Sequence, residues 1–156
     1  LQWASKPEER HRLWRARHDA FWAAKAAWPG QLAMTTDVCV PISHLADIVA
    51  WTRAEMEREG LVGPIVGHVG DGNFHVITFS PPDDAARKRR IEDFAERLAE
   101  RAIAVGGTCT GEHGVGLGKR HLLAKEHGGA IALMRAVKRA LDPAGIMNPG
   151  KMLPPD

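Results

Sequence analysis

Cysteine is scarce in this chain, and a long apolar run is missing altogether. Only Cys39 and Cys109 occur among the 156 residues, far apart and without a CxxC pair. This spacing excludes a disulfide framework and a zinc ribbon, and it favours a reducing compartment. No apolar stretch approaches the roughly 20 residues that cross a bilayer, and the N-terminus lacks the apolar region of a signal peptide. We therefore expect a folded, soluble protein.

Net charge is also small. The 21 basic and 19 acidic side chains give a formal net charge of +2 and are spread along the sequence. No broad field is present to attract nucleic acid or anionic lipid, so we expect neither as a partner. With 44% hydrophobic residues the chain can bury a core as one domain or two small lobes. Because it starts with Leu1 instead of methionine, we expect a segment cut from a longer polypeptide.

The first third of the chain predicts a long amphipathic helix. Ser5 followed by Pro7 and Glu8 indicates a helix that begins near Pro7, and it should run to about Trp28. Arg17 falls in the middle of the apolar stripe, where a cation needs an anionic partner. The stripe consists of Leu13, Trp14, Phe21, Ala24 and Trp28. Four of the five tryptophans lie in the first 28 residues, so part of this face is expected to cover an absent domain.

The order of the following elements predicts an α+β fold. A strand at 32–40, a helix capped by Ser43 and ending at Gly60, strands at 64–69 and 74–79, and a helix at 83–105 follow one another. This order favours an antiparallel sheet with helices packed on one face, a ferredoxin-like plait. We expect residues 1–108 to form this domain. Residues 109–156, with helices at 119–127 and 130–141, should form a small helical C-terminal lobe.

The segment 67–75, GHVGDGNFH, predicts a hairpin that carries two histidines. Asp71-Gly72 is a strong signal for a two-residue type I′ turn, which needs positive φ at both positions. With the turn there, His68 faces His75 across the strands with Cβ atoms about 4.5–5.5 Å apart, and two imidazoles can converge on one ion. Val69 should then face the packed side. The alternative is an ordinary pair of half-buried histidines, and a shift of the turn by one residue should separate them.

A second cluster lies at 110–116, TGEHGVG, in a loop whose glycines allow close approach to a ligand. Alone, this segment is also typical of a helix entry or a solvated corner. Together with the hairpin, Glu112 completes a His68, His75 and Glu112 set, and three protein ligands leave a coordination position open for a small hydroxy acid. His113, beside Glu112, is the natural base for the hydroxyl proton.

Three ordered motifs, at residues 67–75, 111–116 and 148–151, together resemble the C-terminal domain of FAD-linked oxidases of the vanillyl-alcohol oxidase superfamily. The group that contains D-lactate dehydrogenase (cytochrome) and the FAD subunit of glycolate oxidase is the most similar. The resemblance covers nearly the whole chain, from Leu13 through residues 37–41 to Lys151. It implies that His68, His75 and Glu112 bind a divalent metal, zinc or manganese, and that His113 is the catalytic base.

The same resemblance implies further partners for this chain. Arg17 would hold the substrate carboxylate, for which a bidentate guanidinium is suited, and Asn148 would approach the FAD. The FAD-binding domain of the parent protein, which precedes this segment in the family, is absent from the chain. The substrate would be a small D-2-hydroxy acid, and the electrons would pass on to a cytochrome, a quinone or an electron-transfer flavoprotein. The parent protein would be cytoplasmic or peripheral to the inner membrane.

One difference from related enzymes narrows the range of expected substrates. Related 2-hydroxyglutarate dehydrogenases carry a lysine and an asparagine where this sequence has Thr35 and Ile77, so a short substrate such as lactate is favoured. Two other function classes stay open from the residues alone. One is a metal- or small-molecule-binding module that works without flavin, and the other is a metallohydrolase, which would need a water-activating acid near the cluster.

Overall fold

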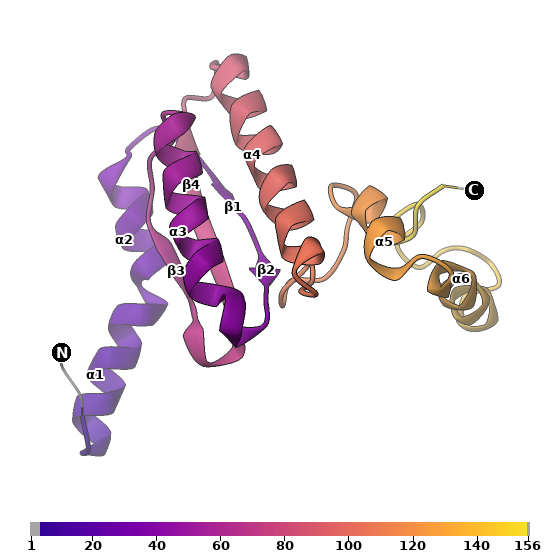
Figure 1. The fold of residues 1–156 in the computed structure, drawn as a ribbon, viewed down its shortest axis with the longest axis horizontal. Helices are drawn as coiled ribbons and strands as arrows, with labels where there is room; N and C mark the ends of the chain where they lie inside the picture. Colours follow the sequence, from indigo (N-terminus) through magenta and orange to yellow (C-terminus); the bar gives the residue numbers. More distant parts are fainter. Residues whose placement is uncertain (1–3, 156) are drawn as a thin grey trace.

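The structure is a computed structural model and describes residues 4–155. The chain begins with two helices, continues into a small antiparallel sheet with two longer helices, and ends in a helical part (Figure 1). In chain order the elements are α1 (Pro7–His18), α2 (Ala20–Ala27), β1 (Leu32–Thr35), β2 (Val38–Cys39), α3 (Ile42–Arg58), β3 (Ile65–His68), the 3-10 turn η1 (Val69–Asp71), β4 (Asn73–Ser80), α4 (Ala85–Ala104), α5 (Arg120–His127) and α6 (Ala130–Leu141).

Strand β4 is the centre of the sheet, and every other strand pairs with it in antiparallel orientation. β1 and β2 follow one continuous register against β4, from Leu32 opposite Ser80 to Cys39 opposite Asn73. The predicted strand 32–40 is therefore present but is interrupted at residues 36–37. An isolated antiparallel β-bridge between Cys39 and Thr108 occupies the position of the last strand of a ferredoxin-like plait. The predicted α+β fold is confirmed.

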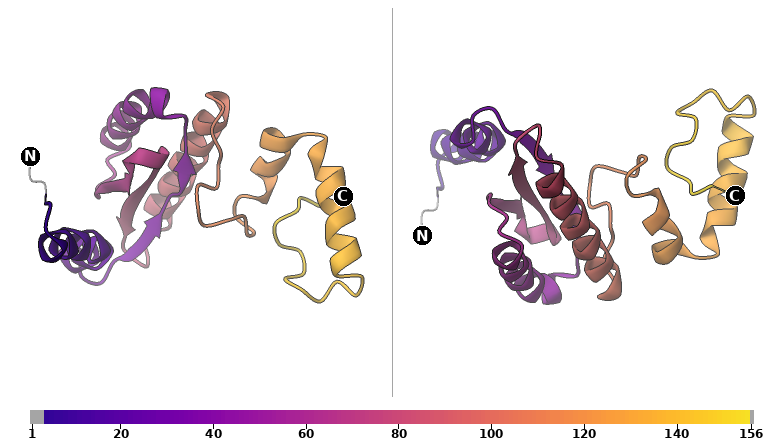
Figure 2. Two further views of the ribbon diagram at one scale, coloured as in Figure 1. Left: turned by 90° about the horizontal axis from the view of Figure 1, so that it is seen from below. Right: turned by 90° about the horizontal axis from the view of Figure 1, so that it is seen from above.

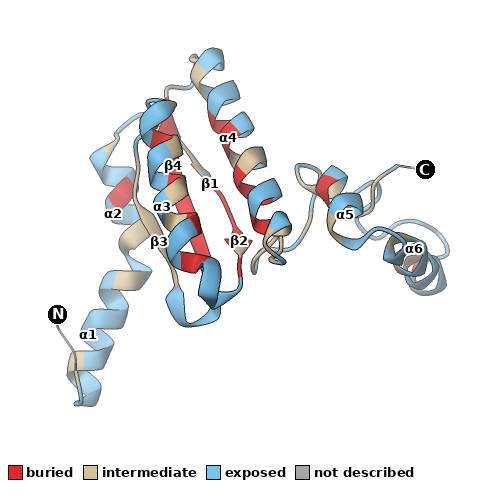
Figure 3. Ribbon diagram, in the orientation of Figure 1, coloured by how far each residue is buried: buried red, intermediate tan, exposed pale blue. Residues whose placement is uncertain are grey.

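Helices α3 and α4 cover one face of the sheet and enclose the main core (Figure 3). One face of each helix is buried: Leu45, Ile48, Thr52 and Met56 from α3, and Ile91, Phe94, Leu98 and Ala102 from α4. Asp84 caps α4 by accepting a hydrogen bond from the Arg87 N–H at 2.8 Å. The alternating face of β4 that carries Phe74 and Val76 completes this core.

The opposite face of β4 packs against α2. Ala24 is buried with Ile77 and Phe79, and the Trp28 ring stacks on Phe79 with centroids 4.5 Å apart. Trp14 and Trp22 remain 55% and 65% exposed, whereas Trp3 lies outside the described residues. This second face is the one on which His75 lies, two residues before Ile77 along the strand.

The single N-terminal helix predicted from Pro7 to Trp28 is wrong, because the helix is interrupted at Asp19. The His18 ring donates from Nδ1 to the Trp14 carbonyl at 2.8 Å, so a side chain enters the hydrogen-bond ladder of the last turn of α1. The predicted caps Ser5 and Ser43 are also wrong. Lys6 and Pro41 occupy these positions without a side-chain cap.

Helices α5 and α6 lie to one side of the sheet and are reached through the loop 105–119 (Figure 2). Both predicted helices are present here. α5 buries Leu122 and Leu123, whereas α6 buries no side chain, and its apolar residues Leu133, Val137 and Leu141 are exposed. The domain boundary near residue 108 stays a prediction.

Truncation of Leu98 to alanine is expected to lower the free energy of unfolding by about 2–5 kcal/mol, because this fully buried side chain lies in the core between the sheet and α4. Chemical denaturation followed by circular dichroism measures the loss. Leu117→Ala, at a position that is 61% exposed, is the matched control and should change stability by less than about 0.5 kcal/mol. Equal losses in the two variants would contradict this assignment of the core.

Candidate metal and substrate site

The hairpin between β3 and β4 has a register different from the predicted one. His68 lies opposite Asn73, and His75 lies opposite Val66. The direct His68–His75 pair predicted from the sequence is therefore wrong. Val69, predicted to pack inward, is 69% exposed in the loop.

The cause is the longer loop formed by η1 and Gly72. Gly72 has a positive φ of 76°, but Asp71 lies in the 3-10 turn, so no type I′ turn forms. Gly72 is held by the segment after β2, since the Val40 N–H donates to the Gly72 carbonyl at 3.0 Å. A Cβ at Gly72 would lie 2.0 Å from the Val40 carbonyl oxygen, so this contact requires glycine.

The two histidines nevertheless share one face of the sheet. When the turn moves by one residue, His68 pairs with the residue two positions away from His75 on β4. Side chains along a strand alternate between the two faces with a period of two, so both histidines still point to the same face. The expectation that such a shift would separate the histidines is also wrong. His68 is a diagonal neighbour of His75, and the Nε2 atoms of the two rings lie 3.8 and 3.1 Å from Glu112 Oε1.

Glu112 reaches the hairpin because its loop is bound to Asp37, a residue that the sequence prediction missed. Asp37 sits between β1 and β2, is 2% exposed, and accepts hydrogen bonds from the backbone N–H groups of Glu112 and His113. The available signal was an acidic residue inside an otherwise uncharged strand. Such a group is stable in a protein interior only when donors surround it.

The orientation of His75 follows from the same strand break. Its Nδ1–H donates to the Thr36 carbonyl at 3.1 Å, so in the neutral ring the Nε2 lone pair faces Glu112. His113 stacks on this ring with centroids 5.0 Å apart and planes 8° from parallel. The two imidazoles thus lie one above the other beside a carboxylate.

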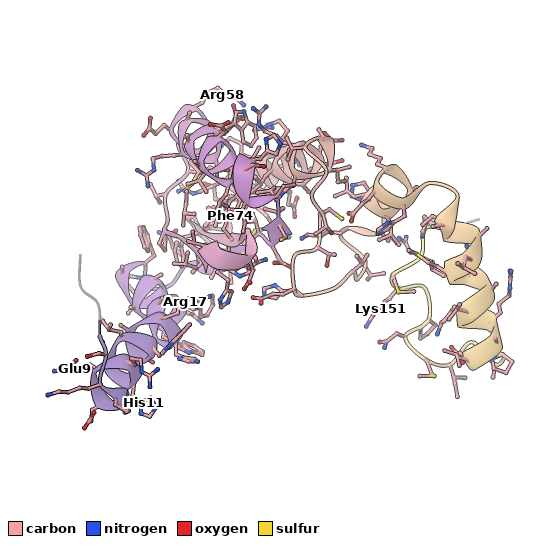
Figure 4. All side chains as sticks on the ribbon, turned by 60° about the horizontal axis from the view of Figure 1, so that its bottom comes forward. Glu9, His11, Arg17, Arg58, Phe74 and Lys151 are labelled. Atoms are coloured by element: carbon pink, nitrogen blue, oxygen red, sulfur yellow. The ribbon has the colours of Figure 1, made fainter. Side chains whose placement is uncertain are left out.

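Arg17 closes the cluster from α1. Its Nη2 donates to His68 Nε2 at 3.2 Å, whereas its buried Nε–H has no hydrogen-bond partner among the described residues. In Figure 4, Arg17 lies at the end of α1 nearest the sheet, and Glu9 and His11 lie at the far end. The guanidinium therefore retains one buried donor for an acceptor that the chain does not supply.

Two overlapping groups of side chains have ligand atoms within 4.8 Å of one another: His68 with His75 and Glu112, and Asp37 with His75 and His113. The residues predicted as metal ligands, base and carboxylate clamp are thus brought together. Asn148 is not part of the cluster. It lies in the loop after α6, with a positive φ of 46°, and its Oδ1 accepts a hydrogen bond from Lys151 at 3.4 Å.

The start of the loop is fixed by two charged side chains near Cys109. The Lys119 ammonium donates to the carbonyls of Asp37 and Cys109, and burial lowers the pKa of this lysine. Burial also raises the pKa of the Cys109 thiol to about 12, with the neighbouring Glu126 acting in the same direction. Cys109 therefore stays a thiol within the core.

Residues 1–152 match the sequence family described as FAD linked oxidases, C-terminal domain. The chain belongs to this family. A probable mitochondrial D-lactate dehydrogenase of Danio rerio is 55% identical over 97% of the chain, and the mitochondrial D-lactate dehydrogenase [cytochrome] of Arabidopsis thaliana is 44% identical over 99%. The glycolate oxidase subunit GlcD of Bacillus subtilis is 35% identical over 100% of the chain.

The chain spans 31%, 28% and 33% of the lengths of these three relatives. Most of each relative therefore has no counterpart in the present sequence. Among residues 4–155, no helix combines the length and the apolar character that crossing a membrane requires.

Glu126 makes the stability of this region depend on pH. Burial opposes ionisation of its carboxyl, but hydrogen bonds from the Cys109 N–H and from Thr108 outweigh this, and the pKa of Glu126 is lowered. A carboxyl with a lowered pKa in the folded state stabilises above its ordinary pKa, and this contribution disappears as the pH falls through the lowered value.

Glu126→Gln is therefore expected to lower the free energy of unfolding by about 1.5–3 kcal/mol at pH 7 and by progressively less below pH 4.5. Denaturation curves at several pH values measure this difference. Glu57→Gln, an exposed carboxylate on α3, is the control. A loss of stability for Glu126→Gln that stays constant from pH 7 to strongly acidic pH would contradict the assignment.

Proposed function

We propose that this chain is the substrate- and metal-binding part of an FAD-dependent D-2-hydroxy-acid dehydrogenase that acts on a short substrate such as D-lactate or glycolate. The observation that carries the proposal is the convergence of His68, His75 and Glu112 beside the unsatisfied guanidinium of Arg17. The family membership and the names of the relatives support the same reaction class.

The donor set fits a divalent cation. With the His75 Nδ1–H bound to the Thr36 carbonyl, its Nε2 lone pair faces Glu112 Oε1 at 3.1 Å. Two acceptors at this distance repel unless a proton or a cation lies beside both. A ring nitrogen that donates to a backbone carbonyl is also the usual support of a histidine ligand. Two imidazoles and one carboxylate suit zinc or manganese.

Arg17 would bind the substrate carboxylate. Its Nε–H is buried without a partner, and its Nη2 borders His68. A carboxylate accepting from Nε and a terminal nitrogen would satisfy the orphan donor and fix the substrate in one orientation. The substrate hydroxyl oxygen would then be held next to the metal ligands.

His113 would accept the hydroxyl proton. A divalent ion bound at His68, His75 and Glu112 would lower the pKa of a substrate hydroxyl on it. The His113 side chain is 56% exposed, so it is accessible from the open side of the cluster, and its Nδ1 lies 3.8 Å from the buried carboxylate of Asp37. His113 is therefore placed between the open side of the cluster, where the substrate would enter, and a buried carboxylate.

The family implies FAD, which in the whole protein supplies the acceptor for the hydride from the substrate carbon. Asn148 would contribute to the flavin side of the site from the loop after α6. The electrons would leave the flavin for a cytochrome, a quinone or an electron-transfer flavoprotein. The chain alone would bind and orient the substrate without oxidising it.

The environment of His75 favours a short substrate. Thr35 lies directly opposite Ile77, and Ile77 follows His75 on the same face of β4 and is 2% exposed. Neither side chain carries a positive charge that could pair with a second carboxylate. A longer dicarboxylic substrate would therefore leave a charge without a partner along this strand.

Two apolar surfaces would pack against the remainder of the parent protein. One is the groove between α6 and the C-terminal loop, lined by Leu133, Met134, Val137, Leu141, Met147 and Met152. The other is the outer face of α1 and α2 with Trp14 and Trp22. Exposed apolar surface of this kind is typical of contact sites, and the relatives are about three times as long as this chain.

The site roles are tested in the full-length protein purified with its FAD. His75→Ala and Glu112→Ala should each release the bound divalent metal and abolish turnover, because each removes one of three ligands. His113→Ala should retain one metal per chain but lower kcat by about 10²–10⁴-fold, the typical contribution of a general base. Elemental analysis and reduction of the flavin by D-lactate measure the two effects.

His121→Ala, which removes an exposed histidine on α5, is the matched control and should keep both properties. If His113→Ala lost the metal while Glu112→Ala retained it, the two roles would be reversed. Turnover by a full-length protein that contains no metal would contradict the proposal as a whole.

Leu141→Asp on α6 should weaken the attachment of this chain to the rest of the protein, because it places a charge on an apolar contact surface. In the full-length protein we expect a lower melting temperature and faster cleavage by protease between the two parts. In the isolated chain the same change should leave the melting temperature nearly unchanged, since Leu141 is 76% exposed. Equal destabilisation in both contexts would contradict the docking surface.

A further inference from the structure

We propose that Asp37 is a positioning residue that holds the Glu112–His113 loop and the His75 ring in the arrangement needed to bind the cation and move the proton. The inference rests on the proposed function, because it assigns a role toward that same site. Asp37 lies at the break between β1 and β2, away from the segments that carry the predicted ligands.

The Asp37 carboxylate accepts hydrogen bonds through both of its oxygens. Oδ1 accepts from Asn73 Nδ2 at 3.0 Å and from the Glu112 N–H at 3.2 Å. Oδ2 accepts from the N–H groups of Glu112 and His113 at 3.1 and 2.8 Å. The ring nitrogens Nδ1 of His75 and His113 lie at 3.5 and 3.8 Å from the same carboxylate. An ionised carboxylate is the side chain that can accept from this many donors.

The loop is shaped to meet this carboxylate. Gly111 has a positive φ of 51°, and a Cβ there would lie 2.1 Å from Asp37 Oδ1. The absence of a side chain lets the backbone turn so that two successive N–H groups point at one anion, which is an arrangement known as a nest. The side chains of Glu112 and His113 are then projected toward His75 from a fixed backbone.

The strand break supplies a second constraint on the same histidine. The Thr36 carbonyl accepts the His75 Nδ1–H, and the neighbouring Asp37 carbonyl accepts from Lys119. Residues 36 and 37 therefore orient the ligand ring and anchor the loop that carries Glu112 at its middle and at its C-terminal end. Since both oxygens of Asp37 are already occupied by donors, the residue acts through His75, Glu112 and His113 and does not itself bind the cation.

Asp37→Asn is a diagnostic change because it keeps the size of the side chain and replaces an acceptor oxygen by a donor NH2. In either orientation of the new amide, its NH2 group faces another donor. This donor is the Asn73 amide in one orientation and the loop N–H groups in the other. The loop should lose its anchor while the three ligands of the cation remain present. Gly111→Ala disturbs the same contact from the loop side and retains the charge of Asp37.

The experiment uses the full-length protein with its FAD. After removal of metal by a chelator, Zn²⁺ and Mn²⁺ affinities are measured by competition with a chromophoric chelator, and kcat and KM are measured with D-lactate. For Asp37→Asn we expect metal affinity and kcat each to fall by about 10–100-fold, the usual effect of losing a group that orients a ligand. KM should change by less than about threefold, because Arg17 still binds the carboxylate. Asp47→Asn on α3 is the matched control for removal of one negative charge and should equal the wild type.

A purely structural role for Asp37 would lower the melting temperature but leave metal affinity and kcat per folded molecule at their wild-type values, and that result overturns the inference. If Asp37→Asn does not fold, Gly111→Ala decides by the same two measurements. Wild-type protein that neither binds Zn²⁺ or Mn²⁺ nor oxidises a hydroxy acid would instead contradict the proposed function. Failure of the role proposed for Asp37 is therefore distinguishable from failure of the proposed function.

Discussion

The arrangement of this site depends on the hydrogen bonds that the buried carboxylate of Asp37 accepts. Glu112 and His113 belong to a glycine-rich loop with little regular structure, whereas His68 and His75 belong to a rigid sheet. Backbone N–H groups bound to Asp37 join the two parts. A charge in the interior is costly without partners, so the loop and the strand break stabilise each other. The side chains that could act on a ligand then come together on one face of β4.

The elements with strong periodic patterns could be predicted from the sequence. The apolar faces of α3 and α4 and the alternation along β4 reflect burial against one sheet, and local pattern alone indicates them. The interruption at Asp19 was not predictable, because it involves a contact between His18 and a backbone carbonyl within a strongly helical pattern. The caps Ser5 and Ser43 were misassigned because Lys6 and Pro41 occupy the N-cap positions of α1 and α3, and neither makes a side-chain cap hydrogen bond.

The sequence predicted which histidines and which glutamate come together in the site, but not how they are arranged. The hairpin was placed by the local turn signal at Asp71-Gly72, whereas the actual turn is set by a distant contact between Gly72 and Val40. The histidines remained neighbours because a change in pairing by two positions preserves the face. Asp37 was missed for a related reason. Its partners lie in segments far away in the chain, and no local spacing connects them.

We propose that His68, His75 and Glu112 together hold one divalent cation next to Arg17. The most direct measurement is anomalous diffraction at the zinc and manganese edges from crystals of the full-length protein with bound D-lactate. We expect a single anomalous peak about 2.0–2.3 Å from one atom of each of the three side chains, with the substrate carboxylate in contact with the Arg17 guanidinium. An anomalous peak elsewhere, or D-lactate bound at this site with no metal, would contradict it.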